Sequence, residues 1–147
     1  MTEEDWEHAL GGVHVLASTG GRIVAHAAVV ERLLHVGGRP RRAGYVEAVA
    51  VHPDHQRQGV GRAVMEEAAR LIAEGFELGA LGTGEHPFYH RLGWETWRGP
   101  SFVRMPDGTE RPTPAEDGFI LVLRTPATPP LDLEGPIVCE WRPGDAW

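Results

Sequence analysis

The most informative segment of this chain is Val51-His52-Pro53-Asp54-His55-Gln56-Arg57-Gln58-Gly59-Val60-Gly61-Arg62-Ala63. An apolar strand ends before Pro53, the chain turns, and a helix begins near Gly59 and Gly61. Such a turn leaves main-chain N–H groups without partners at a helix N-terminus that carries about half a positive charge. Glycines there let a phosphate group come close to the main chain. The stretch therefore predicts a phosphate-binding loop between a strand and a helix.

Outward from this loop, the hydrophobic pattern predicts alternating short elements on both sides. Strands are expected at residues 13–18, 22–35, 45–51, 76–81, 94–97, 102–105, 119–123 and 137–141. Helices are expected at residues 3–10, 59–74 and 87–92, with loops at 36–41 and 106–118. Strand hairpins around a strand–loop–helix–strand unit indicate a mixed α/β sheet of the α+β class, in a single domain spanning residues 1–147.

The composition narrows the class of protein. The formal net charge is -7, with 14 basic and 21 acidic residues, which argues against nucleic-acid binding and suits a cationic partner. No apolar run is long enough to span a membrane, and no secretory signal opens the chain. Cys139 is the only cysteine, so an internal disulfide and a Cys-rich zinc site are excluded. A cytoplasmic protein is the simplest expectation.

The glycine loop has a longer context than an ordinary flexible loop before a helix. Gln56-x-x-Gly59-x-Gly61 follows a strand and opens an amphipathic helix. This pattern resembles the acetyl-CoA signature of the GNAT acetyltransferases, and it differs from a P-loop, which needs a Lys that this chain lacks. The later segment Pro87-Phe88-Tyr89-His90-Arg91-Leu92-Gly93-Trp94 is also similar to that family. Taken alone, its two aromatics would read as core residues.

The resemblance implies the GNAT fold, with acetyl-CoA as the acyl donor, CoA as a product and no metal. It implies that the strands at 45–51 and 76–81 splay apart, and that the thioester carbonyl faces a main-chain N–H near Val49. The implied cofactor-binding residues are Val49, Ala50, Val51, Gln56, Arg57, Gln58, Gly59, Val60, Gly61 and Arg62. Arg57 and Arg62 could equally be solvated surface arginines.

Acetyl transfer to an amine needs a base for the amine and a proton donor for the departing thiolate. Glu47 lies within an apolar strand, where a carboxylate is costly to bury unless it is paired or used. We expect Glu47 to act as the base, through water, and Tyr89 as the acid. The alternatives are a solvent-facing glutamate and a packed tyrosine ring.

Three separated blocks are similar to the aminoglycoside 2'-N-acetyltransferases: residues 5–12, residues 44–47 and residues 138–147. The resemblance implies a polycationic aminoglycoside as the acceptor, held by carboxylates. By position these acceptor-binding groups are Asp5, Glu47, Glu116 or Asp117, Asp145 and the terminal carboxylate of Trp147. It also implies a possible homodimer.

The chain departs from that family at two places. Relatives carry an N-terminal strand and helical segment before the block at residue 5, so an N-terminally shortened fold is expected, and a serine-rich stretch of relatives reads Gly82-Thr83-Gly84-Glu85 here. His52 and His55 lack a third ligand at suitable spacing, so no metal site is expected. Two other hypotheses remain open: acetylation of another small amine or peptide N-terminus, and a CoA-binding module without turnover.

Overall fold

The computed structural model describes residue 3 and residues 9–147. Its strands are β1 (Val13–Thr19), β2 (Arg22–Val36), β3 (Arg39–Val51), β4 (Leu78–Gly82), β5 (Glu95–Thr96), β6 (Ser101–Arg104), β7 (Glu110–Pro112), β8 (Ile120–Arg124) and β9 (Ile137–Glu140). The helices are α2 (Val60–Gly75) and α3 (His86–His90), with 3₁₀ turns η1 (Pro53–His55) and η2 (Pro114–Glu116). In this described part, no helix is long and apolar enough to cross a membrane.

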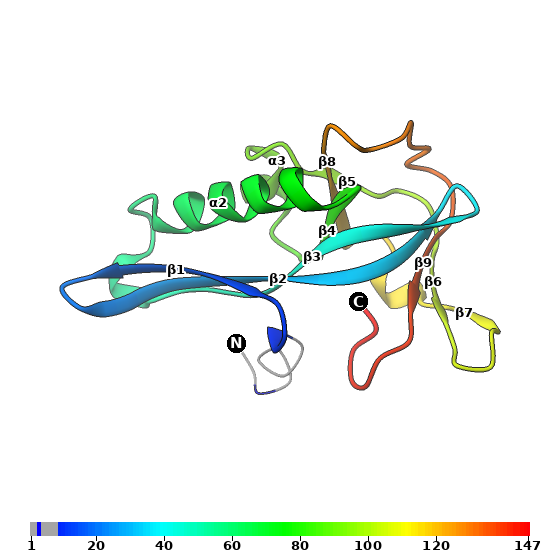
Figure 1. Cartoon of the computed structure of the whole chain (residues 1–147), viewed down its shortest axis with the longest axis horizontal. Helices are drawn as coiled ribbons and strands as arrows, with labels where there is room; N and C mark the ends of the chain where they lie inside the picture. The colour runs from blue at the N-terminus through cyan, green and yellow to red at the C-terminus, as the bar shows by residue number, and fades with distance from the viewer. Residues whose placement is uncertain (1–2, 4–8) are drawn as a thin grey trace.

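The strands form one mixed sheet in the order β5-β8-β4-β3-β2-β9-β6-β7, and β1 pairs with residues 22–29 of β2 (Figure 1). The β3–β4 and β6–β9 pairs are parallel, whereas the other pairs are antiparallel. The sequence-based prediction of a mixed sheet with a central strand–loop–helix–strand unit is confirmed.

The two faces of the central strands carry different parts of the chain. Val46 packs in the hydrophobic cluster beneath α2, which contacts β1, β2, β3 and β4. Its neighbour Tyr45 faces the other way and packs in a second cluster with Trp147 at the C-terminal end. Because side chains alternate along a strand, Glu47 shares the face of Tyr45. The sheet therefore separates helix α2 from the C-terminal segment.

Strands β3 and β4 pair at one end only. Ala43 pairs with Leu78, Gly44 with Gly79 and Tyr45 with Ala80, and the ladder does not continue beyond that point. A β-bulge follows directly on the β2 side, where Ala48 adopts a left-handed φ of 53°. The splay expected between these two strands is thus present, and it begins after Tyr45.

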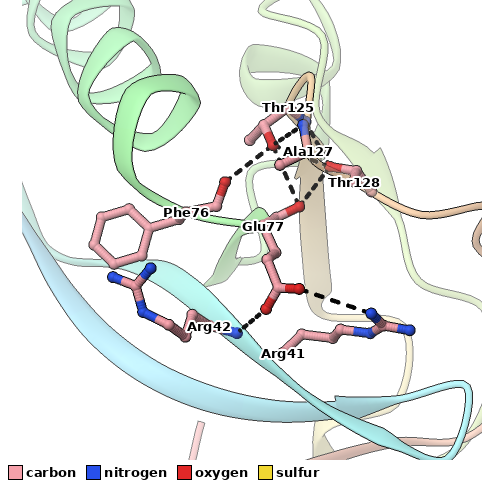
Figure 2. Close-up of polar contacts among 7 residues, drawn as sticks. All are labelled: Arg41, Arg42, Phe76, Glu77, Thr125, Ala127 and Thr128. Atoms are coloured by element: carbon pink, nitrogen blue, oxygen red, sulfur yellow. Dashed lines mark hydrogen bonds and ion pairs between the residues drawn. The ribbon is translucent and has the colours of Figure 1, made fainter.

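The paired end is held by a cluster around Glu77, immediately before β4 (Figure 2). The Glu77 carboxylate accepts a hydrogen bond from the Arg42 main-chain N–H at 2.7 Å and lies 3.7 Å from the Arg41 guanidinium. The hydroxyls of Thr125 and Thr128 donate to the Glu77 carbonyl at 3.3 and 2.6 Å. Because these bonds tie the start of β4 to β3 and to the segment after β8, the two strands separate only toward their other ends.

Three expectations about the elements need correction or fall outside the described residues. The loop expected at 36–41 is a two-residue turn, and β3 already begins at Arg39. Pro40 is tolerated because this part of β3 pairs with β2 alone, so one of its edges has no ladder to break. The expected loop at 106–118 contains β7, whose residues are all exposed and so give no hydrophobic alternation. Most of the expected helix at 3–10 lies outside the described residues.

Candidate active site

The glycine loop has the geometry that the sequence predicts. Strand β3 ends at Val51, η1 turns the chain, and the side-chain amide of Gln56 donates to the Val51 carbonyl at 3.2 Å. Gly59 caps α2 with a φ of 80°, a conformation that favours glycine, and it offers no side chain to the first helical N–H groups. Those groups are therefore left for a ligand or water.

A cavity of about 640 Å³, here called the loop cavity, lies against this helix end. Its lining residues are Val49, Ala50, Val51, Gln56, Arg57, Gly59, Gly61, Arg62, Glu85, Phe88, Tyr89 and Arg91. Of the predicted cofactor-binding residues, Gln58 and Val60 do not line it, and the Gln58 side chain instead donates to the Asp54 carbonyl at 3.4 Å.

The loop cavity fits a phosphate-bearing ligand. A Cβ built on Gly59 would meet no atom within 4 Å, so the space in front of the helix end is open. Three arginines line the cavity, of which Arg62 also bonds to Glu66 at 2.7 Å. The main-chain N–H groups of a glycine-containing helix end and guanidinium groups are donors that anionic oxygens prefer. The residues present thus suit the pyrophosphate of a CoA thioester.

A second cavity of about 530 Å³, here called the acidic cavity, opens on the splay between β3 and β4. Its lining residues are Tyr45, Val46, Glu47, Ala48, Val49, Leu81, Gly82, Thr83, Gly84, Glu85, Tyr89, Glu116, Asp145 and Trp147. Four of these are carboxylates: Glu47, Glu85, Glu116 and Asp145. The cavity is therefore suited to a ligand that carries several positive charges.

The two cavities share Val49, Glu85 and Tyr89. Tyr89 is buried on α3, and burial together with the nearby charge of Glu85 raises the pKa of its hydroxyl to about 12. The phenol is therefore protonated at neutral pH and can donate a proton or a hydrogen bond. A group that passes from a ligand in one cavity to a ligand in the other would do so beside these residues.

Glu47 is held by a residue that sequence reasoning missed. Its Oε1 accepts a hydrogen bond from Arg142 Nη1 at 2.5 Å, and the side chains are only 10% and 15% exposed. Arg142 also donates from Nε to the Asp145 carbonyl at 2.8 Å and lies over the Tyr45 ring at 5.5 Å. The ion pair fixes the direction of the carboxylate and leaves Oε2 for other partners.

The two acidic residues of the loop before β8 have different positions. Glu116 lines the acidic cavity, where burial and the neighbouring Asp145 raise the pKa of its carboxyl group. Asp117 does not line it; its Oδ1 accepts hydrogen bonds from the main-chain N–H and the hydroxyl of Ser101 at 2.8 and 2.7 Å. Asp117 is thus a structural residue. The predicted Asp5 lies outside the described residues.

Trp147 is buried in the wall of the acidic cavity, and its ring N–H donates to Thr113 at 3.1 Å. Tyr45 lines the same cavity, and its hydroxyl has no hydrogen-bond partner in the part of the chain that the structure describes. Sequence reasoning missed this tyrosine and Glu85. Tyr45 directly precedes the splay on the face of Glu47, so strand alternation would have been the signal for it.

The two histidines of the glycine loop lie close together, but they do not form part of a metal-binding group in the described residues. The rings of His52 and His55 are 5.7 Å apart, and His52 Nδ1 accepts from the Asp54 N–H at 3.2 Å. Within residues 3 and 9–147, no group of three or more potential ligands is placed to hold a metal ion.

These features belong together in a known family. A family model for the acetyltransferase (GNAT) domain matches residues 3–97, so the chain is an acetyltransferase of the GNAT family. It is 41% identical to the aminoglycoside 2'-N-acetyltransferase of Mycolicibacterium fortuitum over 150 residues, which cover 100% of this chain and 77% of that protein. The chain shares the family of that relative.

Solved structures support the same fold. The CoA complex of the GNAT family N-acetyltransferase YhbS from Escherichia coli matches with a TM-score of 0.61 and 18% identity, covering 84% of this chain and 64% of that one. A GNAT family acetyltransferase from Brucella melitensis in complex with acetyl-CoA matches with a TM-score of 0.55 and 21% identity, covering 86% and 67%. A GCN5-related N-acetyltransferase from Kribbella flavida matches with a TM-score of 0.52 and 26% identity over 56% of this chain, which spans only 22% of that protein.

Proposed function

We propose that this acetyltransferase moves the acetyl group of acetyl-CoA to the 2'-amino group of an aminoglycoside. The observation that carries the proposal is the junction of the two cavities: an anion-binding loop cavity and an acidic cavity meet at Val49, Glu85 and Tyr89. The 41% identity to an aminoglycoside 2'-N-acetyltransferase supports the choice of acceptor.

Acetyl-CoA would supply an activated acyl group from the loop cavity, and the protein would supply the contacts around it. The first-turn amides of α2 and the guanidinium groups of Arg57, Arg62 and Arg91 would hold the phosphates. The main-chain N–H of Val49 would donate to the thioester carbonyl, where negative charge develops. Arg62 would exchange its bond to Glu66 for this ligand or hold both.

The acidic cavity would bind the acceptor through its ammonium groups. Glu116 and Asp145 provide fixed negative charges, and the Tyr45 hydroxyl provides a polar contact that burial keeps protonated by raising the pKa of the phenol. The predicted contributions of Asp5 and of the Trp147 carboxylate stay predictions. A neutral sugar or a peptide of acidic sequence would not offer this cavity the positive charges that its carboxylates attract.

The proton balance assigns a role to each end of the site. As the amine nitrogen forms its bond to the acyl carbon and the C–S bond breaks, the nitrogen loses a proton and the sulfur gains one. Glu47, through its Oε2 and a bridging water, would take the proton from nitrogen, and the Tyr89 hydroxyl would give one to sulfur. An acidic cavity raises the pKa of the bound amine, which makes such a base necessary.

The test is a thiol-release assay with matched acceptors. The proposal predicts turnover with aminoglycosides that carry a 2'-amino group and none with counterparts that carry a 2'-hydroxyl. Turnover on other amines but not on these would assign a different acceptor. CoA binding without turnover on any amine would indicate a binding module and overturn the proposal.

A further inference from the structure

The acetyl group would react beside a peptide unit whose orientation is unusual. Opposite the single residue Ala27, β3 carries two residues, because His26 pairs with Ala50 whereas Ala28 pairs with Glu47. This bulge places Ala48 at a φ of 53°, in the left-handed region that is energetically unfavourable for a residue with a Cβ. Such a conformation persists only where the surroundings hold it in place.

A buried histidine holds it. His26 Nδ1 lies 2.8 Å from the Ala48 carbonyl oxygen, and the residue is only 8% exposed. Because a carbonyl can only accept, Nδ1 must carry the proton and donate it. His14 Nδ1 lies 2.7 Å from His26 Nε2 and so is hydrogen-bonded to the other nitrogen of the same ring. With the proton of His26 on Nδ1, His26 Nε2 accepts from His14, and this contact favours the tautomer of His26 that binds Ala48.

The held peptide unit is the one that carries the Val49 N–H. In a trans peptide the carbonyl and the N–H of one unit point in opposite directions, so the bond to His26 directs this N–H away from the histidine. Val49 lines both the loop cavity and the acidic cavity, and β3 has no β4 partner at this position. The N–H is therefore presented at the junction where the acyl carbon would lie.

We infer that His26, oriented by His14, is the positioning residue that fixes the Ala48–Val49 peptide so that the Val49 N–H donates to the acyl carbonyl of the bound thioester. This rests on the proposed function. His26 lines neither cavity, so it would act through the bulge. A donor held in place before reaction stabilises developing oxyanion charge without reorganisation.

The test compares His26→Leu, which removes the donor, with His26→Asn, whose amide nitrogen takes nearly the place of Nδ1. In His26→Leu, we expect kcat to fall about 10- to 100-fold, whereas the Kd for CoA, which has no acyl carbonyl, stays unchanged. The carbonyl stretch of bound ¹³C-labelled acetyl-CoA should shift toward its frequency in water. In His26→Asn, kcat and the carbonyl frequency should return to near the wild-type values.

A second measurement needs no ligand. The Val49 amide ¹⁵N and ¹H shifts should move in His26→Leu and return in His26→Asn, with circular dichroism confirming that both variants fold. Unchanged kcat, carbonyl frequency and Val49 shifts in a folded His26→Leu would overturn the inference alone. The inference would also be overturned if His26→Asn behaved like His26→Leu, or if His26→Leu lost affinity for CoA and for acetyl-CoA to the same extent. A wild-type protein that does not bind acetyl-CoA would overturn the proposed function itself.

Discussion

Arg142 Nη1 is bonded to Glu47 Oε1 at 2.5 Å, so the segment after β9 is tied directly to the carboxylate at the centre of β3. The residues are 95 positions apart in the chain, and both are largely buried. One bond thereby closes the wall of the acidic cavity and orients the proposed base.

The first prediction concerns this ion pair. In a double-mutant cycle of Glu47→Gln and Arg142→Gln, the coupling free energy of unfolding should be about 1–3 kcal/mol, because charged hydrogen bonds shielded from water are strong. The matched control is the more exposed pair Arg124–Glu95, whose atoms lie 2.7 Å apart and whose coupling should stay below about 1 kcal/mol. Urea denaturation at pH 7 measures both. Equal coupling free energies in the two cycles would show that burial does not strengthen the Glu47–Arg142 ion pair.

The second prediction concerns Tyr89. Tyr89→Phe removes the proton donor and should lower kcat about 10²- to 10⁴-fold while the Kd for CoA stays unchanged. Because the pKa of the hydroxyl is raised to about 12, the wild-type group stays protonated through pH 10. Below pH 10, ionisation of Tyr89 should therefore not lower the kcat of the wild type, and the kcat–pH profiles of wild type and Tyr89→Phe should have the same shape on the alkaline side. A full-rate Phe variant would show that Tyr89 only packs.

The third prediction separates Glu116 from Asp117. Glu116→Gln should raise the KM of a 2'-amino aminoglycoside about 2- to 5-fold, since one partly screened charge is lost. Asp117→Asn should leave that KM nearly unchanged and lower stability, because Asp117 holds Ser101.

The raised pKa of Glu116 also sets the direction of its pH effect. The native state binds this proton more tightly than the unfolded chain, so ionisation costs stability. That cost is absent below the ordinary glutamate pKa and fully present above the folded value. Glu116→Gln should therefore be at least as stable as wild type at pH 7, and a clear loss of stability there would contradict the assignment. Thermal unfolding at pH 4 and pH 7 measures it.

The fourth prediction concerns the glycine loop. Gly59→Ala and the control Gly108→Ala both place a Cβ at a left-handed φ, of 80° and 87°, where no atom lies within 4 Å. Both should lose about 1–2 kcal/mol of stability from backbone strain. Only Gly59→Ala places its methyl group at the loop cavity, so only it should raise the KM for acetyl-CoA, by about tenfold. Equal KM values in the two variants would place the phosphates elsewhere.

The sequence was informative where local chemistry decides the structure. The glycine loop, the helix after it and the strand before it were all predictable, because turn residues and hydrophobic periodicity act over short distances. Strand β7 was missed because its exposed residues carry no pattern, and the extension of β3 through Pro40 depends on which edge is paired.

The site was predictable in part for the same reason. Glu47 and Tyr89 stood out as polar groups in apolar or aromatic segments, and the structure places both at the acidic cavity. Arg142 and His26 could not be found, because their partners Glu47 and Ala48 are brought to them only by the folded sheet. The expected homodimer stays a prediction.

We propose that the loop cavity binds the pyrophosphate of a CoA thioester through the α2 helix end. The most direct test is calorimetric titration of folded protein with acetyl-CoA and with CoA at two temperatures, so that a heat-silent temperature cannot hide binding. We predict saturable binding of both ligands at one site per chain, which inorganic pyrophosphate at high concentration weakens. A titration without binding heat at either temperature would contradict the account.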